Sequence, residues 1–456
     1  MNFPRGFIDS ISDCAGFSRA DFIAAHEQQS VNSIRFNPLK PTEGNHHFSE
    51  EMLQQVPWCK NGVYLKERPK YTLDPLLHAG AYYVQEASSM FIHHVVEQLL
   101  PNQTELKVLD LCAAPGGKSS LLASMDQFDF VLSNEIIGSR VPVLYENTVK
   151  WGSAKMYVSN NDPADFLGVG ELFDVVMVDA PCSGSGLFRK DEGAMKEWNI
   201  DMVNFCSLRQ QRILQAATQA LKPGGYLIYS TCSYSTSENE GNLDFLIDTG
   251  IFSSISIKTP VEWKVVESHS SKHAAYGYRF YPDKIMGEGF FCGVLQKNDS
   301  SNVSYMSEHT SNVKTLNTRT ELASWIKPAG ALIFEEDEVI YAVRENHLSL
   351  RGLLKRHLRL RKSGVKVGAV MKKGLVPDHE LALSELISLE VNRLEVNKID
   401  AISYLRKEGI TVQDCHEGLH LVSYLGCGIG WAKVVSGRIK NNYPMSWRIM
   451  MRNDHK

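Results

Sequence analysis

The sequence predicts an α/β protein whose helices wrap a mostly parallel sheet. Between residues 107 and 297, runs rich in Val, Ile and Tyr alternate with helical segments, and this alternation is typical of parallel strands joined by helical crossovers. Apolar residues make up 43% of the chain and charged residues 22%, as in globular proteins. The length of 456 residues exceeds that of one ordinary domain, so several hydrophobic cores are expected.

The predicted elements follow one another in a regular order. Strands are expected at 107–111, 130–133, 155–159, 173–179 and 226–230, with a closing edge strand at 290–295. Helices are expected from about residue 118 onward and over 141–151, 201–221 and 238–247. A doubly wound sheet of this kind exposes the carboxyl ends of its strands at one edge, where ligands bind.

Breaks in this pattern predict four parts of the chain. They are an N-terminal unit of mixed, short-period sequence (1–75), the α/β region (76–297), a Ser/Asn/Thr-rich linker (298–319) and a second, mostly β unit (320–456). The chain has no apolar run long enough to cross a bilayer, and its first residues lack the apolar stretch of a signal peptide. We therefore expect a cytoplasmic protein without a membrane partner.

The charge is divided unevenly between these parts. Residues 320–456 contain 21 Lys and Arg against 16 Asp and Glu, although the whole chain has a formal net charge of −4. Within this unit, residues 351–373 hold nine basic residues and no acidic one. Concentrated positive charge attracts a polyanion, so contact with nucleic acid is expected here. The alternative is a solvated helix face, which normally mixes both signs.

Nine cysteines are scattered along the chain without any Cys-x-x-Cys pair, which argues against a disulfide framework and a zinc ribbon. The adjacent histidine pairs have no Cys or carboxylate at ligand spacing, so no metal site is expected. Cys182 and Cys232 stand out because each follows a strand-like run, the first together with Asp179. Their thiols are expected to face one crevice. They are core residues, a redox pair, or a nucleophile with a second thiol beside it.

The turn after the first strand predicts a cofactor site. Small residues from Cys112 to Gly117 stand where a strand passes into a helix, so that the backbone can approach a ligand at the helix N-terminus. The turn matches neither the Gly-x-Gly-x-x-Gly dinucleotide pattern nor a Walker A loop. Glu135 closes the second strand and suits the hydroxyls of a ribose. Asp162 lies beyond the third and suits an adenine amino group. Each acid alone can be a helix cap or turn residue, but together these groups favour an adenosyl cofactor.

These residues belong to motifs that resemble the Nop/Sun family of RNA cytosine-C5 methyltransferases. The motifs are DLCAAPGGK (110–118), DAPCSG (179–184), STCS (230–233) with ENE (238–240), and RFYP (279–282) leading to GEGFF (287–291). Upstream, YYVQEASSM (82–90) is similar to the family's entry helix. In the tail, GWAK (430–433) and RIKNNYP (438–444) resemble the PUA-like RNA-binding domain that ends the bacterial F-type 16S rRNA methyltransferases.

The resemblance implies a class I, Rossmann-like sheet that binds S-adenosylmethionine, with a small N-terminal RNA-binding unit and a C-terminal PUA-like domain. The implied reaction is methylation of cytosine C5 in RNA, with 16S rRNA, free or within the small ribosomal subunit, as the leading substrate. The alternatives are a tRNA cytosine-C5 methyltransferase and a non-catalytic RNA-binding assembly factor. Because cytosine C5 is a poor nucleophile, a thiolate must first add at C6. The resemblance assigns this attack to Cys232 and the release of product to Cys182, with Asp179 as the acid near N3.

The resemblance also implies the residues that contact the cofactor. The ribose is expected against Glu135 and the adenine against Asp162. The methionine part is expected against the loop after the first strand and the end of the fourth, namely Cys112, Ala113, Ala114, Pro115, Gly116, Gly117, Lys118 and Asp179.

RNA contacts are expected at cations in both parts of the chain. Lys190 is expected to pair with Asp179 or to hold a phosphate, and Arg140 to face the cofactor, the RNA or solvent. In the tail, Lys433, Arg438 and Lys440 are expected to hold phosphates. The aromatic residues beside them either stack on unpaired bases or belong to the core; they are Trp431, Tyr443 and Trp447.

Overall fold

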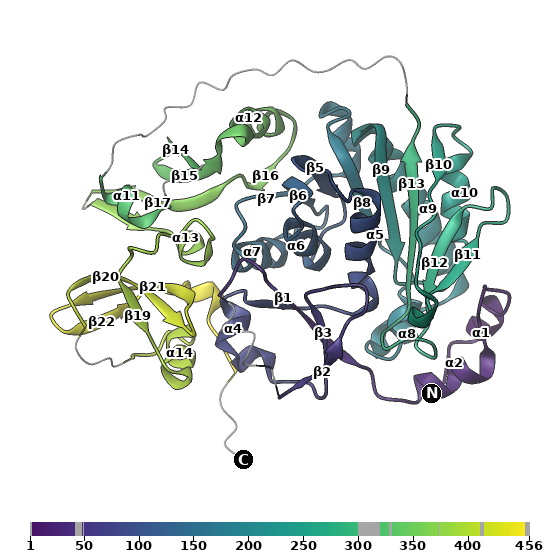
Figure 1. Cartoon of the computed structure of the whole chain (residues 1–456), viewed down its shortest axis with the longest axis horizontal. Coiled ribbons are helices and arrows are strands. Elements are labelled where there is room, and N and C mark those ends of the chain that lie inside the picture. Colours follow the sequence, from purple (N-terminus) through teal and green to yellow (C-terminus); the bar gives the residue numbers. More distant parts are fainter. Residues whose placement is uncertain are drawn as a thin grey trace.

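The computed structural model describes residues 2–41, 48, 50–299, 320–327, 331–372, 374–410 and 415–451. A ten-stranded sheet forms its centre (Figure 1). The strands are β5 (Leu106–Asp110), β6 (Phe128–Asn134), β7 (Met156–Ser159), β8 (Phe173–Asp179), β9 (Leu221–Thr231), β10 (Phe252–Ser254), β11 (Val266–His269), β12 (Tyr276–Phe280), β13 (Phe290–Lys297) and β16 (Leu360–Lys362). Their order is β11-β12-β13-β9-β8-β5-β6-β7-β16, with β10 paired to β13. The middle strands β7-β6-β5-β8-β9 are parallel.

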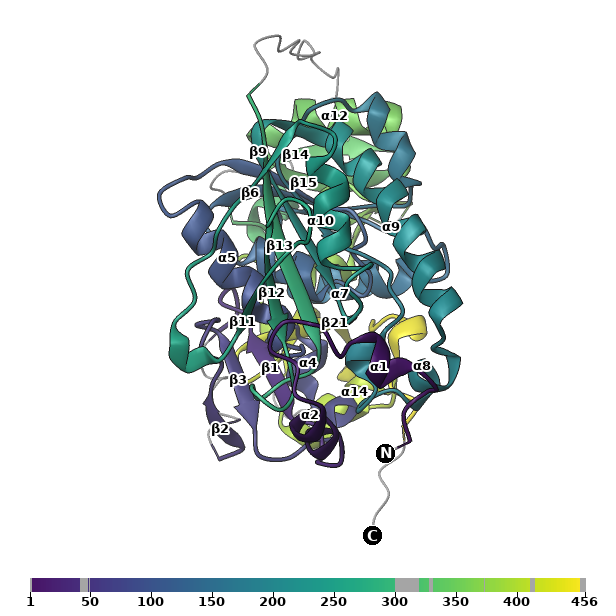
Figure 2. The same ribbon diagram turned by 90° about the vertical axis from the view of Figure 1, so that its right-hand side faces the viewer.

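Helices cover both faces of this sheet. Figure 2 shows α5 and α9 on opposite sides of the strands. The first layer contains α5 (Phe91–Leu99), α6 (Gly117–Ala123) and α7 (Val141–Trp151), and the second contains α9 (Ile200–Ala220), α10 (Glu240–Ile247) and α12 (Leu348–His357). Alternate side chains of β8 divide between the two cores: Val175 and Met177 pack with α5 and α6, while Val176 and Val178 pack with α9 and α10. The strand is buried on both faces, which explains its continuous apolar sequence.

The predicted strands and helices of the α/β region are confirmed, apart from the place of one strand. The run at 290–295 forms β13, but β13 pairs with both β9 and β12 and therefore lies inside the sheet. The expectation of an edge strand there is wrong. The hairpin β11–β12 lies beyond β13 and forms this edge of the sheet. It was not predicted from the sequence, because Gly277 interrupts the apolar pattern of β12.

The other end of the sheet is completed from the C-terminal half of the chain. β16 pairs antiparallel with β7, so the predicted second unit contributes a strand to the central sheet. Most of the predicted linker, residues 300–319, lies outside the described residues. The predicted domain limits at residues 75, 297 and 319 stay a prediction.

The basic run at 351–373 is only partly a surface, and residue 373 lies outside the described residues. Arg351 and Lys362 are 2% and 3% exposed and form ion pairs with Glu336 and Glu380 at 2.5 and 2.8 Å. The expectation that the whole run contacts nucleic acid is therefore wrong for these two residues. Burying a cation costs free energy unless an anion pairs with it. Here the acidic partners, Glu336 and Glu380, lie outside the basic run.

The residues before β5 form two separate pieces. Helices α1 (Phe7–Ser10) and α2 (Arg19–His26) pack in one core with Phe188 and Tyr234 of the α/β region. The next residues form an antiparallel sheet in the order β2-β3-β1-β4. Its strands are β1 (Asn32–Phe36), β2 (Met52–Gln55), β3 (Gly62–Leu65) and β4 (Tyr82–Val84), and α4 (Pro75–His78) lies between β3 and β4 in the chain.

The C-terminal residues form two further four-stranded sheets. The first has the order β14-β15-β17-β18, from β14 (Ala331–Glu336), β15 (Val339–Arg344), β17 (Val365–Met371) and β18 (Gly374–Pro377). The second has the order β19-β20-β21-β22, from β19 (Arg393–Glu395), β20 (Gly418–Tyr424), β21 (Cys427–Val435) and β22 (Arg438–Asn441). Their helices are α11 (Thr320–Trp325), α13 (His379–Leu383) and α14 (Lys398–Leu405).

The first and last parts of the chain pack together. One hydrophobic core contains Ile34 and Tyr82 of the N-terminal sheet with Tyr404 of α14 and with Ala432 of β21, in the second C-terminal sheet. Figure 1 shows these two sheets side by side below the central sheet. In the part of the chain that the structure describes, no helix combines the length and the apolar character needed to cross a membrane.

Candidate active site

The candidate site lies where the strand order of the central sheet reverses. The chain proceeds from β5 to β6 and β7 on one side, and then to β8 and β9 on the other. At such a point a crevice forms beyond the carboxyl ends of the strands. A cleft of about 750 Å³ occupies it. Eight of the predicted site residues line this cleft: Cys112, Ala114, Glu135, Arg140, Asp162, Asp179, Cys182 and Cys232.

The two cysteines meet in this cleft. The Sγ atoms of Cys182 and Cys232 lie 3.1 Å apart, and both thiols are free. The hydrogen bond with Cys232 and burial raise the pKa of the Cys182 thiol well above its ordinary value, and the nearby Glu238 carboxylate acts in the same direction. Cys182 is therefore a protonated thiol at neutral pH, and a thiol is a poorer nucleophile than a thiolate.

Glu238 ties the two cysteine loops together. Its carboxylate is fully buried and accepts hydrogen bonds from the Ser183 backbone N–H at 2.8 Å and from the hydroxyls of Ser183 and Ser233 at 2.5 Å each. Gln210 of α9 donates to the same carboxylate at 3.1 Å. Each serine directly follows one cysteine in the sequence, so Glu238 fixes the separation of the two thiols. Glu238 belongs to the motif ENE (238–240), but its contact with Ser183 in the loop of Cys182 depends on the tertiary structure.

Gly186 allows the two loops to approach closely. Its N–H donates to the Cys232 carbonyl at 2.8 Å, and a Cβ on Gly186 would stand 2.4 Å from the carbonyl oxygen of Gly289. Only glycine fits between these two carbonyl groups.

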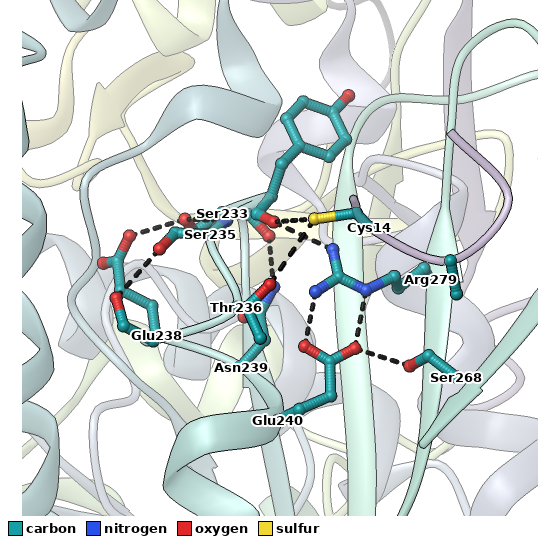
Figure 3. Close-up of polar contacts among 12 residues, drawn as sticks. Cys14, Ser233, Ser235, Thr236, Glu238, Asn239, Glu240, Ser268 and Arg279 are labelled. Carbon is teal, nitrogen blue, oxygen red and sulfur yellow. Dashed lines mark hydrogen bonds and ion pairs between the residues drawn. The ribbon is translucent and has the colours of Figure 1, made fainter. Parts of the chain in front are cut away.

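A buried ion pair fixes the segment after the second cysteine (Figure 3). Arg279 of β12 pairs with both carboxylate oxygens of Glu240, at the start of α10, and its third nitrogen donates to the carbonyl oxygen of Tyr234 at 2.8 Å. Cys14, from the N-terminal segment, places its Sγ 3.5 Å from the same carbonyl oxygen. The hairpin and the N-terminal helices that sequence patterns did not reveal therefore support the cysteine loop.

Replacing Glu240 by alanine is expected to lower the free energy of unfolding by about 3–5 kcal/mol, because it leaves the Arg279 guanidinium buried without its partner. Both side chains are less than 5% exposed. Ser268 donates to Glu240 at 2.5 Å, so Ser268→Ala removes one hydrogen bond and is expected to cost about 1 kcal/mol. Urea unfolding followed by tryptophan fluorescence measures both; equal losses in the two variants would contradict the importance of the ion pair.

Asp179 is held by Lys118 rather than by Lys190. The Lys118 Nζ lies 2.8 Å from Asp179 Oδ2, and Ser230 donates to Asp179 Oδ1 at 2.6 Å. Burial alone would lower the pKa of Lys118, but the adjacent Asp179 carboxylate raises it, so the ammonium stays charged. The Nζ of Lys190 lies 3.9 Å from Glu288 instead. The expectation that Lys190 pairs with Asp179 is wrong; its role in holding a phosphate stays a prediction.

The loop from Cys112 to Lys118 turns as the sequence predicts. Gly116 has φ +110°, a conformation that favours glycine, and it precedes the first residue of α6. With Asp110, Gly117 and Lys118, the loop lines a hollow of about 180 Å³ that shares Cys112, Ala114 and Asp179 with the main cleft. Burial raises the pKa of Asp110 to about 7. Its Oδ2 accepts from Ser119 at 2.6 Å, whereas its buried Oδ1 has no hydrogen-bond partner among the described residues.

Arg35 supports this loop from behind. The side chain is 1% exposed, lies over the Trp151 ring at 4.4 Å, and donates to the Gly117 carbonyl at 3.2 Å and to Ser120 Oγ at 2.6 Å. Burial lowers its pKa to about 10. A single arginine in a short strand is usually exposed, and no local sequence pattern predicted that Arg35 would be buried beside this loop.

Glu135 faces the cleft, whereas its neighbour Asn134 does not. Asn134 is fully buried and donates to the carbonyl groups of Leu111 and Asn161 at 3.2 and 3.0 Å. Glu135 accepts from the Ile137 N–H at 2.8 Å and lies 3.3 Å from Arg140. Arg140 also donates to the Ala114 carbonyl at 2.6 Å, so it joins the predicted ribose ligand to the loop.

Asp162 caps a helical turn at the cleft, and its contact with an adenine stays a prediction. Its carboxylate accepts from the Ala164 N–H at 2.9 Å and caps a short helical turn, Pro163–Gly168, while its side chain lines the cleft. Arg212 of α9 forms an ion pair with it. Burial acts against ionisation here, but the hydrogen bonds from Ala164 and Arg212 lower its pKa.

The predicted RNA-contacting cations of the tail lie on one hairpin, away from the lining of the cleft. Lys433 and Lys440 are cross-strand neighbours on β21 and β22, and both are exposed, as is Arg438. Trp431 and Tyr443 are 2% and 1% exposed, and Trp431 donates to the Asp378 carbonyl at 2.8 Å. Of the two roles left open for these aromatics, the core role therefore holds for Trp431 and Tyr443.

Five parallel strands followed by antiparallel β13, with a glycine-turned loop after β5 and acids after β6 and β7, define a Rossmann-like methyltransferase fold. Comparison with known proteins agrees. The family described as 16S rRNA methyltransferase RsmB/F matches residues 96–296, the N-terminal domain of 16S rRNA methyltransferase RsmF matches residues 3–87, and the methyltransferase RsmF PUA domain matches residues 391–449.

Individual relatives are similar over nearly the whole chain. Ribosomal RNA small subunit methyltransferase F of Vibrio parahaemolyticus is 30% identical, over 97% of this chain and 96% of that protein. The crystal structure of PH0851 has a TM-score of 0.57 and 26% identity, covering 65% of this chain and 66% of the other. NSun6 from Pyrococcus horikoshii, at 19% identity and a TM-score of 0.54, covers 65% of this chain and 99% of its own and shares the fold. The chain belongs to the 16S rRNA methyltransferase RsmB/F family, which confirms the resemblance noted in its motifs.

Proposed function

We propose that this protein transfers a methyl group from S-adenosylmethionine to C5 of a cytosine in RNA, with 16S rRNA as the substrate. The observation that carries the proposal is the pair of free thiols 3.1 Å apart, in a cleft that also holds Asp179 and Lys118. Transfer to an exposed nitrogen or oxygen needs no thiol. Two thiols and a carboxylate at the carboxyl ends of neighbouring strands suit a reaction in which a carbon atom of the substrate must first be made nucleophilic.

The residues present fit the proposed cofactor. The hollow beside the loop offers backbone groups at the start of α6, and the unpartnered buried Oδ1 of Asp110 suits a positively charged amino group. Glu135 and Asp162 line the cleft at the ends of β6 and β7, where they suit a ribose and an adenine. When bound, the cofactor supplies an electrophilic methyl group.

The side chains divide the proposed reaction between them. The Cys232 thiolate adds to C6 of cytosine, which gives C5 the character of an enamine carbon. We assign Asp179 as a proton relay: the ammonium of Lys118, 2.8 Å away, gives a proton to the Asp179 carboxylate, which passes it to N3 and so favours this addition. After methyl transfer, a base must remove the C5 proton so that the bond between Cys232 and C6 can break. We assign this release to Cys182, which is in contact with Cys232. Once Cys232 is bonded to C6, its hydrogen bond and charge no longer raise the pKa of Cys182, so the Cys182 thiol passes its proton to water and its thiolate takes the C5 proton.

The proposed substrate rests on the family and the flanking units. The relatives named as small subunit methyltransferases match this chain from end to end, including the PUA domain. We propose the N-terminal sheet and the exposed hairpin that carries Lys433, Arg438 and Lys440 as RNA-contacting surfaces. Cytosine must be unpaired or flipped out to reach the thiols in the cleft.

The test is methyl incorporation from labelled S-adenosylmethionine into three separate substrates: naked 16S rRNA, free small subunits and tRNA. We expect incorporation into 16S rRNA, naked or assembled, recovered as 5-methylcytosine after nuclease digestion. Incorporation into tRNA alone would favour the tRNA enzyme. RNA binding without incorporation into any of the three would favour an assembly factor and reject the catalytic proposal.

A further inference from the structure

One face of α9 carries exposed or half-buried side chains that the proposed chemistry does not use. We call Met202, Phe205, Arg209 and Arg212 the α9 stripe, because their spacing of three, four and three residues places them on one side of the helix. Met202 and Phe205 are 36% and 62% exposed. The core face of α9, with Val203, points elsewhere.

The α9 stripe is continuous with the candidate active site. Met202, Arg209 and Arg212 line the same cleft as Cys182 and Cys232, and Phe205 stands between Met202 and Arg209 on the helix. A molecule that reaches the thiols therefore passes beside this row.

The charges of the cleft leave one cation available. Among the described residues, three arginines line it, and two of them have carboxylate partners: Arg140 with Glu135 and Arg212 with Asp162. Arg209 forms no ion pair within 4.0 Å with a described residue.

Among the residues that the structure describes, five carboxylates line the cleft; Glu135 and Asp162 are paired with the two arginines, and Glu197 forms no ion pair with Arg209 within 4.0 Å. Asp179 is paired with Lys118, and Asp191 caps α8 (Glu192–Glu197) by accepting from the N–H groups of Gly193 and Ala194. Arg209 is thus positioned to bind an anion that enters the cleft from outside.

We propose that the α9 stripe binds the RNA strand next to the target cytosine, with one unpaired base stacked on Phe205 and one phosphate bound by Arg209. This inference rests on the proposed function and specifies how that site holds its substrate. An exposed aromatic ring beside an unpaired guanidinium is the combination with which proteins hold single-stranded RNA, because every base has a face that stacks and every nucleotide carries a negative charge.

Two variants test the proposal by fluorescence anisotropy with a labelled single-stranded oligoribonucleotide of about 15 nucleotides, a length that covers one binding site. Phe205→Ala and Arg209→Ala are each expected to raise the Kd for RNA about tenfold. Arg209→Ala is also expected to reduce the slope of log Kd against log salt by about 0.7, since one phosphate contact is lost, whereas Phe205→Ala leaves the slope unchanged. Phe205→Trp is expected to restore affinity.

Controls separate RNA binding from folding and from the cofactor. Val261→Ala and Lys272→Ala remove an exposed apolar group and an exposed cation elsewhere in the catalytic region and are expected to leave RNA affinity unchanged. The affinity for S-adenosylhomocysteine, measured by calorimetry, is expected to be equal in the wild type and both α9 variants. A loss of that affinity in Arg209→Ala would mean that the cofactor, not RNA, binds there, and would overturn the proposal.

Other outcomes also decide the matter. Unchanged RNA affinity in both variants would reject the stripe as an RNA surface. Loss of binding to small subunits with unchanged binding to naked RNA would assign Phe205 to a protein partner instead. The anisotropy measurement needs no methyl transfer, so a wild-type protein that binds RNA through the stripe but methylates none would reject the proposed function and leave the stripe supported.

Discussion

Cys232→Ala is expected to abolish both methyl transfer and the covalent complex with RNA. Without the thiolate, C6 receives no nucleophile and C5 stays unreactive, so turnover should fall by about 10⁴-fold or more. Cys232 is only partly buried and follows β9 at the cleft, so the substitution removes little packing. We therefore expect near-normal stability with a complete loss of activity.

The covalent complex is measured on a denaturing gel with labelled RNA in which 5-fluorocytosine replaces cytosine, because fluorine at C5 blocks release. Wild-type protein is expected to give a shifted, denaturant-resistant band, and Cys232→Ala none. Cys415→Ala is a matched control, since Cys415 is also a partly buried free cysteine but lies outside the cleft. A band that persists in Cys232→Ala would show that Cys182 makes the attack.

Cys182→Ala is expected to give the opposite phenotype: a covalent complex that accumulates on ordinary cytosine. Here the attack and the methyl transfer proceed, but removal of the C5 proton is slowed, and general-base catalysis of this kind contributes about 10²–10⁴-fold. The raised pKa of Cys182 in the free protein agrees with a thiol that waits protonated while Cys232 attacks. Turnover is therefore expected to fall while the first methyl group is still incorporated.

The measurement is a rapid-quench time course with labelled cofactor, which is expected to show about one methyl group per enzyme followed by a slow steady state. The double variant Cys182→Ala with Cys232→Ala is expected to form no complex, which distinguishes trapping at Cys232 from adventitious crosslinking. If Cys182→Ala alone prevented complex formation, the two assignments would be reversed.

Much of the central sheet could be predicted because its signal is local. Strands β5 to β9 are apolar runs of strand length bounded by turn residues, and each core-facing helix has its own period. The loop at Gly116 was also predictable, since a small-residue turn between a strand and a helix has few alternative structures. The Nop/Sun resemblance rested on the same short motifs and was confirmed by the family match.

The supports of the site could not be predicted, because they come from distant parts of the chain. Arg35 approaches the loop from Cys112 to Lys118 from the N-terminal sheet, and Arg279 holds the segment after Cys232 from a hairpin with a weak pattern. The burial of Arg351 and Lys362 inside a basic run reversed the expected role of these two residues, since their acidic partners lie outside the run. A charge count cannot reveal which charges are paired.

The sequence by itself determined the central architecture and the chemical groups at the strand ends, because strand and helix periodicity and turn chemistry are properties of consecutive residues. Only the tertiary structure decided that the sulfurs of Cys182 and Cys232 touch, that Lys118 rather than Lys190 holds Asp179, and that Arg209 is left without a carboxylate partner among the described residues. Those facts depend on distances between residues that are tens to hundreds of positions apart, and such distances are set by packing rather than by local pattern.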